Sequence, residues 1–119
     1  MATWRPDPTF YPSPRLAAAA PTENLAYVAL LDTGGNGGHD AIGVIDTDEQ
    51  SPTYGTLVGK TELPFAGDEV HHFGWNACSS HLCPWAPHAH VERRYLVVPG
   101  IHSSRIHILD TQPDPRNPR

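Results

Sequence analysis

The sequence predicts an all-β fold built from short antiparallel strands. Runs rich in β-branched and aromatic residues alternate with clusters of turn residues along the middle of the chain. Thirteen prolines and ten glycines in 119 residues favour turns over long helices. No segment has a sustained 3.6-residue hydrophobic period, and the only helix-like stretch is 16–20. The runs predicted as strands are 25–31, 41–46, 55–62, 71–76, 94–99 and 104–110.

Proline-rich stretches flank these strands on both sides. We predict an extended N-terminal arm over residues 1–23 and one β-domain over residues 24–119. The last stretch of that domain, 112–119, has too many prolines to form a helix. The glycine-rich loop 34–38 predicts a hairpin between the first two strands.

Two pairs of strands repeat each other in sequence. In the first pair, 27–30 (YVAL) is followed by 42–47 (IGVIDT); in the second, 95–98 (YLVV) is followed by 106–111 (IHILDT). Both pairs end in Asp-Thr before a polar turn that contains proline. Repeated antiparallel units of this size are typical of β-propeller blades, which have four strands each and an innermost strand that lines a central channel.

A partial β-propeller is therefore the predicted architecture. Residues 71–76 would be the innermost strand of one blade and the two following strands would pair beside it, with the fourth strand expected after residue 119. The first three predicted strands would be outer strands of a second blade, whose innermost strand would come from the C-terminal part of a longer protein. A small sandwich of the same strands, complete by itself, is the alternative.

Charge and hydropathy make two classes of partner unexpected. The formal net charge is −5 with only eight Lys and Arg residues, so the chain lacks the basic stripe of a nucleic-acid-binding protein. No run approaches the ~20 apolar residues of a membrane helix, and no segment is long enough for a secretory signal. We expect a cytoplasmic chain, in which Cys78 and Cys83 are free or metal-bound thiols rather than a disulfide.

Residues 68–90 hold five of the eight histidines and both cysteines. Imidazole is the commonest protein ligand for metals such as copper and zinc, so His71 and His72 are candidate metal ligands. Neighbouring residues on a regular strand point to opposite faces. The pair can therefore share a metal only at a bend or a strand end, which Gly74 would help to form.

The surroundings of this pair offer supporting roles. Asp68 and Glu69 would either orient a ligand imidazole or be solvated. Phe73 and Trp75 would either wall a small apolar pocket or pack in the core.

A structural zinc site is a competing interpretation of the same region. The single residue between the last two histidines does not fit the usual spacing of about three to five, which favours a solvated loop instead. The remaining histidines, His39, His102 and His107, are isolated in sequence, and we expect them to be structural or exposed. The zinc ligands would be Cys78, Cys83 and two of His81, His88 and His90.

The run 68–80 (DEVHHFGWNACSS) resembles a motif of the selenium-binding protein family, also known as methanethiol oxidases. The resemblance extends over about residues 25–119, in the order and spacing of the first quarter or so of a family member. Other matching stretches are 45–48 with 51–54, 63–64, and 103–110 with 114–116.

The resemblance implies a seven-bladed propeller, of which this chain would form about one and a half blades, the C-terminal blades being missing. It also implies copper-dependent oxidation of methanethiol, with oxygen and water, to formaldehyde, hydrogen sulfide and hydrogen peroxide. The partners would be a small thiol and oxygen. His71 and His72 match two of the family's proposed copper ligands, and the others would lie after residue 119, so we expect the 119-residue chain alone to be inactive.

Two positions depart from the family pattern. Gly55 stands where the family's selenium-binding cysteine follows Ser-Pro-x-Tyr, so selenium binding there is not expected. Cys83 is displaced from the family's Cys-x-x-Cys spacing after Cys78, so no role is carried over to that pair. A non-catalytic selenium- or metal-binding module is the alternative function, and a truncated reading frame with no independent function is a third.

Overall fold

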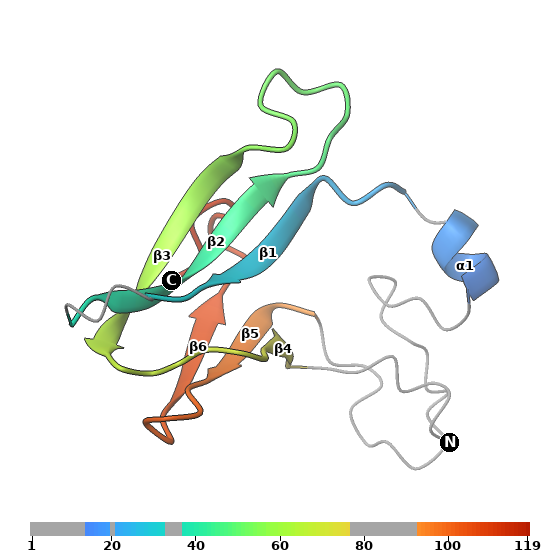
Figure 1. Cartoon of the computed structure of the whole chain (residues 1–119). Coiled ribbons are helices and arrows are strands. Elements are labelled where there is room, and N and C mark those ends of the chain that lie inside the picture. The colour runs from blue at the N-terminus through green and yellow to red at the C-terminus, as the bar shows by residue number, and fades with distance from the viewer. Residues whose placement is uncertain (1–13, 20, 33–36, 77–92) are drawn as a thin grey trace, which may run out of the picture.

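The computed structural model describes residues 14–19, 21–32, 37–76 and 93–119. These residues form two three-stranded antiparallel sheets, with strand orders β1-β2-β3 and β4-β5-β6, so the all-β prediction is confirmed (Figure 1). No helix in this part of the chain is long and apolar enough to cross a membrane. The elements are α1 (Pro14–Ala19), β1 (Leu25–Leu30), β2 (His39–Asp46), β3 (Leu57–Ala66), β4 (Gly74–Trp75), β5 (Tyr95–Pro99) and β6 (Ile106–Asp110).

The repeated sequence units form structurally equivalent hairpins. β1 pairs with β2 and β5 pairs with β6, each in a continuous antiparallel register. In the first hairpin, the Thr47 N–H and hydroxyl donate to the carbonyls of Asn24 and Glu23, both at 2.9 Å. In the second, the Thr111 N–H and hydroxyl both donate to the Arg94 carbonyl, at 3.1 and 2.6 Å. The Asp-Thr motif therefore ties the end of each hairpin to the residues just before its first strand.

Two elements differ from the sequence prediction. The stretch expected to be an extended arm contains the short helix α1, because a proline at the first helical turn is followed by good helix formers. The strand predicted over 71–76 is reduced to Gly74–Trp75, because only these two residues pair with Val97 and Leu96. His71, just before them, contacts Glu69 instead.

A common hydrophobic core joins the two sheets. Its members come from both sheets and from the connection between them, and Tyr27, Ala29, Phe73 and Trp75 pack against it. β2 is the central strand of the first sheet and is buried along most of its length, which explains its almost unbroken apolar sequence. The buried core residues are Ile42, Leu63, Val70, Leu96, Val98 and Leu109.

The residues after β6 cross back to the first sheet, and we call 111–119 the C-terminal strap. The Tyr27 hydroxyl on β1 donates to the Pro115 carbonyl at 2.8 Å, and the Thr61 hydroxyl on β3 donates to the Pro118 carbonyl. Asp110 and Arg119 then exchange two backbone hydrogen bonds, at 2.8 and 3.1 Å, as residues of neighbouring strands do. The strap therefore links both sheets.

Candidate functional site

The connection between β3 and β4 carries a buried carboxylate. The Asp68 side chain is fully buried. It accepts hydrogen bonds from the Ser103 hydroxyl at 2.5 Å, His107 Nε2 at 2.8 Å and Arg105 Nη1 at 3.2 Å. Burial raises the pKa of Asp68, but the hydrogen bonds from Ser103, His107 and Arg105 outweigh that effect and leave the pKa below its ordinary value. Asp68 is therefore not solvated, and its carboxylate does not contact His71 or His72. It anchors the segment between β3 and β4 against β6 and the residues just before it.

The next residue, Glu69, bridges two histidines that are far apart in sequence. Its Oε1 lies 3.1 Å from His71 Nε2, and its Oε2 lies 3.2 Å from His102 Nδ1. Of the two acidic residues predicted to orient a ligand imidazole, Glu69 is the one placed to do so. His102 is not isolated, because it shares this carboxylate with His71.

His71 and His72 are both exposed and lie just before β4, so they meet the strand-end condition inferred from the sequence. Their ring centroids are 6.4 Å apart with an interplanar angle of 38°. Two imidazoles that bind one metal at about 2.0–2.1 Å have ring centres roughly 5–6.4 Å apart. The observed separation lies at the upper end of that range, where the two ligating nitrogens would have to lie on opposite sides of the metal.

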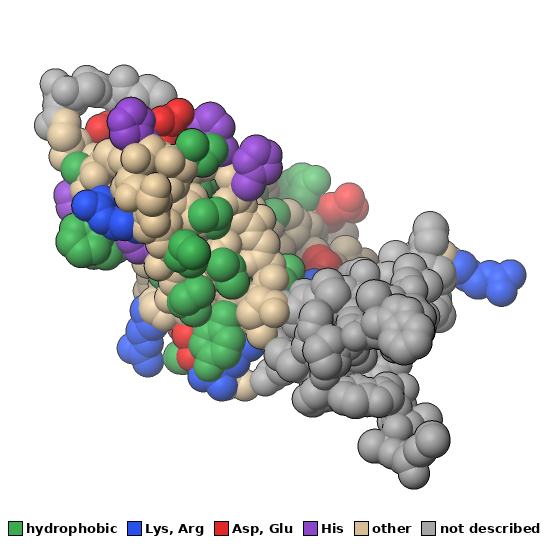
Figure 2. All heavy atoms as spheres, turned by 90° about the horizontal axis from the view of Figure 1, so that it is seen from below, with side chains coloured by type: hydrophobic (Ala, Val, Ile, Leu, Met, Phe, Trp, Pro, Cys, Tyr) green, Lys and Arg blue, Asp and Glu red, His purple; other side chains and the backbone are tan. Residues whose placement is uncertain are grey.

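Two imidazoles alone are fewer ligands than a metal site needs. Among the described residues, no three or more His, Cys, Asp or Glu side chains are grouped so that they could hold a metal ion. Figure 2 shows histidine side chains gathered beside acidic ones at one end of the face seen from below. The ligands of the zinc interpretation, Cys78, Cys83, His81, His88 and His90, lie outside the described residues.

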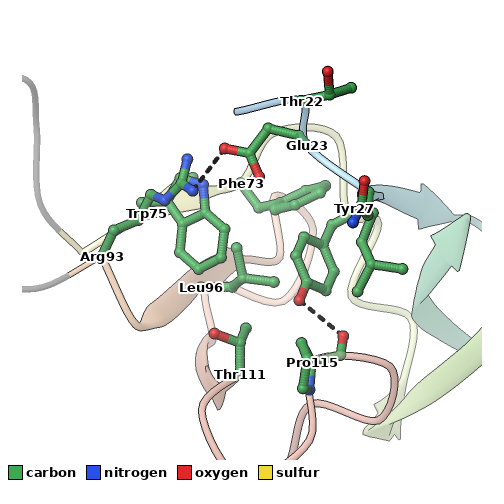
Figure 3. Close-up of a pocket in the computed structure, with 12 residues that line it drawn as sticks. Thr22, Glu23, Tyr27, Phe73, Trp75, Arg93, Leu96, Thr111 and Pro115 are labelled. Carbon is green, nitrogen blue, oxygen red and sulfur yellow. Dashed lines mark hydrogen bonds and ion pairs between the residues drawn. The ribbon is translucent and has the colours of Figure 1, made fainter. Parts of the chain in front are cut away.

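An open cavity of about 780 Å³ lies between the two sheets, within the usual range for small-molecule sites (Figure 3). Phe73 and Trp75 line it and also pack against the core. Neither His71 nor His72 is among the described residues that line it, so the expectation that these aromatic side chains wall a pocket at the histidine pair stays a prediction. Tyr27 meets Trp75 edge-on with ring centroids 5.6 Å apart. Arg93 lies over the Trp75 ring and bonds Glu23 at 2.9 Å, which makes one side of this apolar cavity polar.

Gly55 lies in the turn between β2 and β3 with φ +73°, and a Cβ added there would meet nothing within 4 Å. The turn therefore requires a left-handed backbone conformation, which glycine adopts without the steric cost that a cysteine would incur. The family's cysteine is thus replaced by Gly55 in this chain, at a position where the conformation of the turn favours glycine.

Sequence reasoning did not identify the link between His71 and His102. The only local indication is the single glycine two residues before Glu69, since Gly67 has φ +74° and Glu69 itself has φ +56°. The pairing with His102 depends on packing of the β5–β6 turn against this connection, and no short sequence pattern reports it.

Comparison with known proteins agrees with the motif resemblance. Residues 4–119 match the family model of the 56kDa selenium binding protein. Selenium-binding protein 2 of Arabidopsis thaliana is 43% identical over 109 residues, which is 91% of this chain and 22% of that protein. A methanethiol oxidase of Xenopus laevis is 38% identical over 111 residues, covering 92% of this chain and 22% of that protein.

A solved structure is also similar. The X-ray structure of a hypothetical selenium-binding protein from Sulfolobus tokodaii superposes with a TM-score of 0.83 at 59% identity, covering 94% of this chain and 25% of that one. The chain thus spans between a fifth and a quarter of the length of these relatives, and its matched region includes both sheets and the histidine pair. On the family model and these relatives together, the chain belongs to the 56kDa selenium binding protein family.

Proposed function

We propose that a full-length protein carrying this chain oxidises methanethiol with copper that is held in part by His71 and His72. The observation that carries the proposal is the pair of exposed neighbouring imidazoles before β4, one of them hydrogen-bonded to Glu69. Relatives named methanethiol oxidase, 33–38% identical to this chain, support the reaction class. The overall reaction converts methanethiol, oxygen and water to formaldehyde, hydrogen sulfide and hydrogen peroxide.

When bound, copper would supply a soft centre for the thiolate sulfur and a route for electrons to oxygen. The role of this chain is to hold and orient. A carboxylate accepts hydrogen bonds but cannot donate them, so the Glu69 contact leaves Nδ1 of a neutral His71 free to act as a ligand. Phe73 and Trp75 offer apolar walls for a molecule as small as methanethiol.

The propeller belongs to the same proposal. Two antiparallel sheets that share a core, with equivalent Asp-Thr hairpins, are what two adjacent blades would provide. The backbone exchange between Asp110 and Arg119 is how a further strand would begin beside β6. The remaining blades of the seven would supply the other copper ligands.

A non-catalytic selenium- or metal-binding module is the second candidate. It is favoured by the plant relatives, which are named selenium-binding proteins. The Gly55 turn argues against selenium binding at that position, since a cysteine would be strained there. Metal content together with peroxide release separates the two candidates.

The test uses copper-loaded full-length protein with methanethiol, with hydrogen peroxide and formaldehyde measured together. We expect turnover, and we expect His71→Ala and His72→Ala each to reduce both copper content and peroxide release sharply. His39→Ala is the matched control, because its Nδ1 bonds the Leu63 carbonyl and not Glu69. Undiminished turnover in the double variant would reject the ligand assignment, and robust turnover by residues 1–119 alone would reject the need for further blades.

A further inference from the structure

We propose that Glu69 is a positioning residue that fixes the ring orientation and the tautomer of both His71 and His102. The contacts at 3.1 and 3.2 Å involve both carboxylate oxygens, one for each ring. The consequence for metal binding rests on the proposed function, whereas the orientation of the two rings does not. His102 thereby joins the histidine pair in a cluster that the sequence motif does not contain.

The backbone on either side of Glu69 is held firmly. Asp68 is anchored by its buried network, and Val70 is fully buried, with its N–H donating to Asp40 Oδ2 at 2.8 Å. The Glu69 carbonyl accepts the Ile101 N–H at 3.2 Å. Exposed ion pairs ordinarily contribute little, because two long side chains must be ordered to form them. Here the backbone that carries the carboxylate is already ordered, so forming these contacts costs less conformational entropy.

The histidine on the other side is held by the same connection. The His102 N–H donates to the Asp68 carbonyl at 3.2 Å, and the preceding Gly100 has no room for a Cβ, which would lie 2.8 Å from that carbonyl oxygen. The β5–β6 turn therefore sits tightly against the residues before β4. This packing brings His102 to Glu69 across 33 residues of sequence.

The backbone conformation of Glu69 points to a role for its side chain. Its φ of 56° is left-handed, a region where glycine, asparagine and aspartate are the residues usually found. Local strain of this kind persists where the surroundings enforce it, and it gathers at functional sites. Glycine would adopt this backbone conformation at lower cost. We therefore attribute the presence of glutamate to the contacts of its carboxylate with the two histidines.

The two contacts determine where each neutral ring carries its hydrogen. An ionised carboxylate only accepts, so the hydrogen lies on Nε2 of His71 and on Nδ1 of His102. An unconstrained histidine in water favours the Nε2–H form. His102 is therefore the diagnostic ring, because the contact holds it in the less favoured tautomer, and His71 keeps Nδ1 available for a metal.

The experiment records nitrogen-15 spectra of the histidine rings in a full-length protein carrying this chain. Glu69→Gly removes the carboxylate and suits the left-handed backbone, so its melting temperature should not fall. Glu69→Gln keeps one acceptor oxygen and replaces the other with an NH2 donor, so it can accept a hydrogen bond from only one of the two rings. Glu62→Ala is the control, because Glu62 is an exposed carboxylate that pairs with Lys60 at 2.7 Å.

We expect the Nδ1–H form of His102 to predominate in the unaltered protein, to persist in Glu62→Ala, and to give way to Nε2–H in Glu69→Gly. Glu69→Gln should keep the original tautomer at no more than one of the two rings, because it retains only one acceptor oxygen. Copper(II) affinity, measured by competition with a chelator, should fall about 10–100-fold in Glu69→Gly, as is usual for loss of a group that orients a metal ligand. An unchanged His102 tautomer in Glu69→Gly overturns the proposal. A changed tautomer with unchanged copper affinity supports the positioning role and removes His71 from the copper site.

Discussion

At the scale of single residues, Asp46 shows how one carboxylate organises a turn. It is fully buried at the end of β2 and accepts hydrogen bonds from the hydroxyls of Ser51 and Thr53, both at 2.6 Å, and from the Asp48 N–H at 3.0 Å. The two hydroxyl bonds, and then the Asp48 bond, lower the pKa of Asp46 from 3.8 to about 2. Asp110, at the matching place in the second hairpin, is instead paired with Arg94, which lowers its pKa as well.

This lowered pKa predicts a specific acid sensitivity. Because the pKa of Asp46 is lower in the folded chain than in the unfolded one, its ionisation stabilises the fold above about pH 4, and that stabilisation is lost as the pH falls towards about 2. The urea midpoint, followed by tryptophan fluorescence at low protein concentration, should fall more steeply over this range than in Asp46→Asn. Glu49→Gln, an exposed position in the same turn, should leave the slope unchanged. Parallel curves for Asp46→Asn and the unaltered chain would contradict the assignment.

At the scale of elements, the C-terminal strap (111–119) depends on the close approach of two backbones. A Cβ added at Gly59 on β3 would lie 1.7 Å from the Arg116 carbonyl oxygen, a backbone atom that cannot rotate away. Glycine is therefore required at this position by contact rather than by its own conformation. The same approach allows the hydrogen bonds that the strap accepts from Tyr27 and Thr61.

Gly59→Ala should displace the strap and destabilise the chain by about 1–3 kcal/mol, the usual cost of an overpacked site. Gly74→Ala is the matched control, because Gly74 also lies in a strand but an added Cβ there meets nothing within 4 Å. The measurement is the urea midpoint of each variant, together with the amide exchange rates of the strap. Equal midpoints for the two variants would show that the strap does not pack against β3.

At the scale of the whole molecule, several large hydrophobic side chains of the described residues lie exposed. Ile106 and Ile108 on β6 are 66% and 55% exposed, and Phe65 at the end of β3 is 50% exposed. Figure 2 shows a row of hydrophobic side chains along the face seen from below. Exposed apolar strands at a sheet edge are surfaces that other strands or molecules tend to cover.

We therefore predict that the 119-residue chain, studied alone, self-associates or is only partly ordered. Ile106→Lys with Ile108→Lys should reduce the sedimenting aggregate in analytical ultracentrifugation, because charge on an edge strand opposes pairing. Tyr54→Lys is the control, since Tyr54 is 54% exposed but lies in the turn between β2 and β3. A sharp, reversible two-state melt of a monomer would contradict this prediction.

The sequence by itself determined the fold class and much of the strand pattern. Runs of β-branched and aromatic residues between turn residues placed the strands of Figure 1 to within a few residues, except that the one expected over 71–76 shrank to β4. The repeated Asp-Thr pattern predicted two equivalent hairpins because turn chemistry and side-chain alternation act over a few neighbouring residues. A different local motif, the run 68–80, singled out His71 and His72.

Only the tertiary structure decided which distant groups meet. Asp68 and Glu69 are neighbours in sequence with equal charge, yet one is buried against Ser103 and His107 while the other bridges His71 and His102. That difference arises because the β5–β6 turn packs against the connection before β4. In addition, Glu69 has a left-handed backbone conformation with a positive φ. The contacts with Ser103, His107 and His102 join residues more than 30 positions apart. Their formation depends on the packing of whole sheets, for which no short stretch of sequence carries the information.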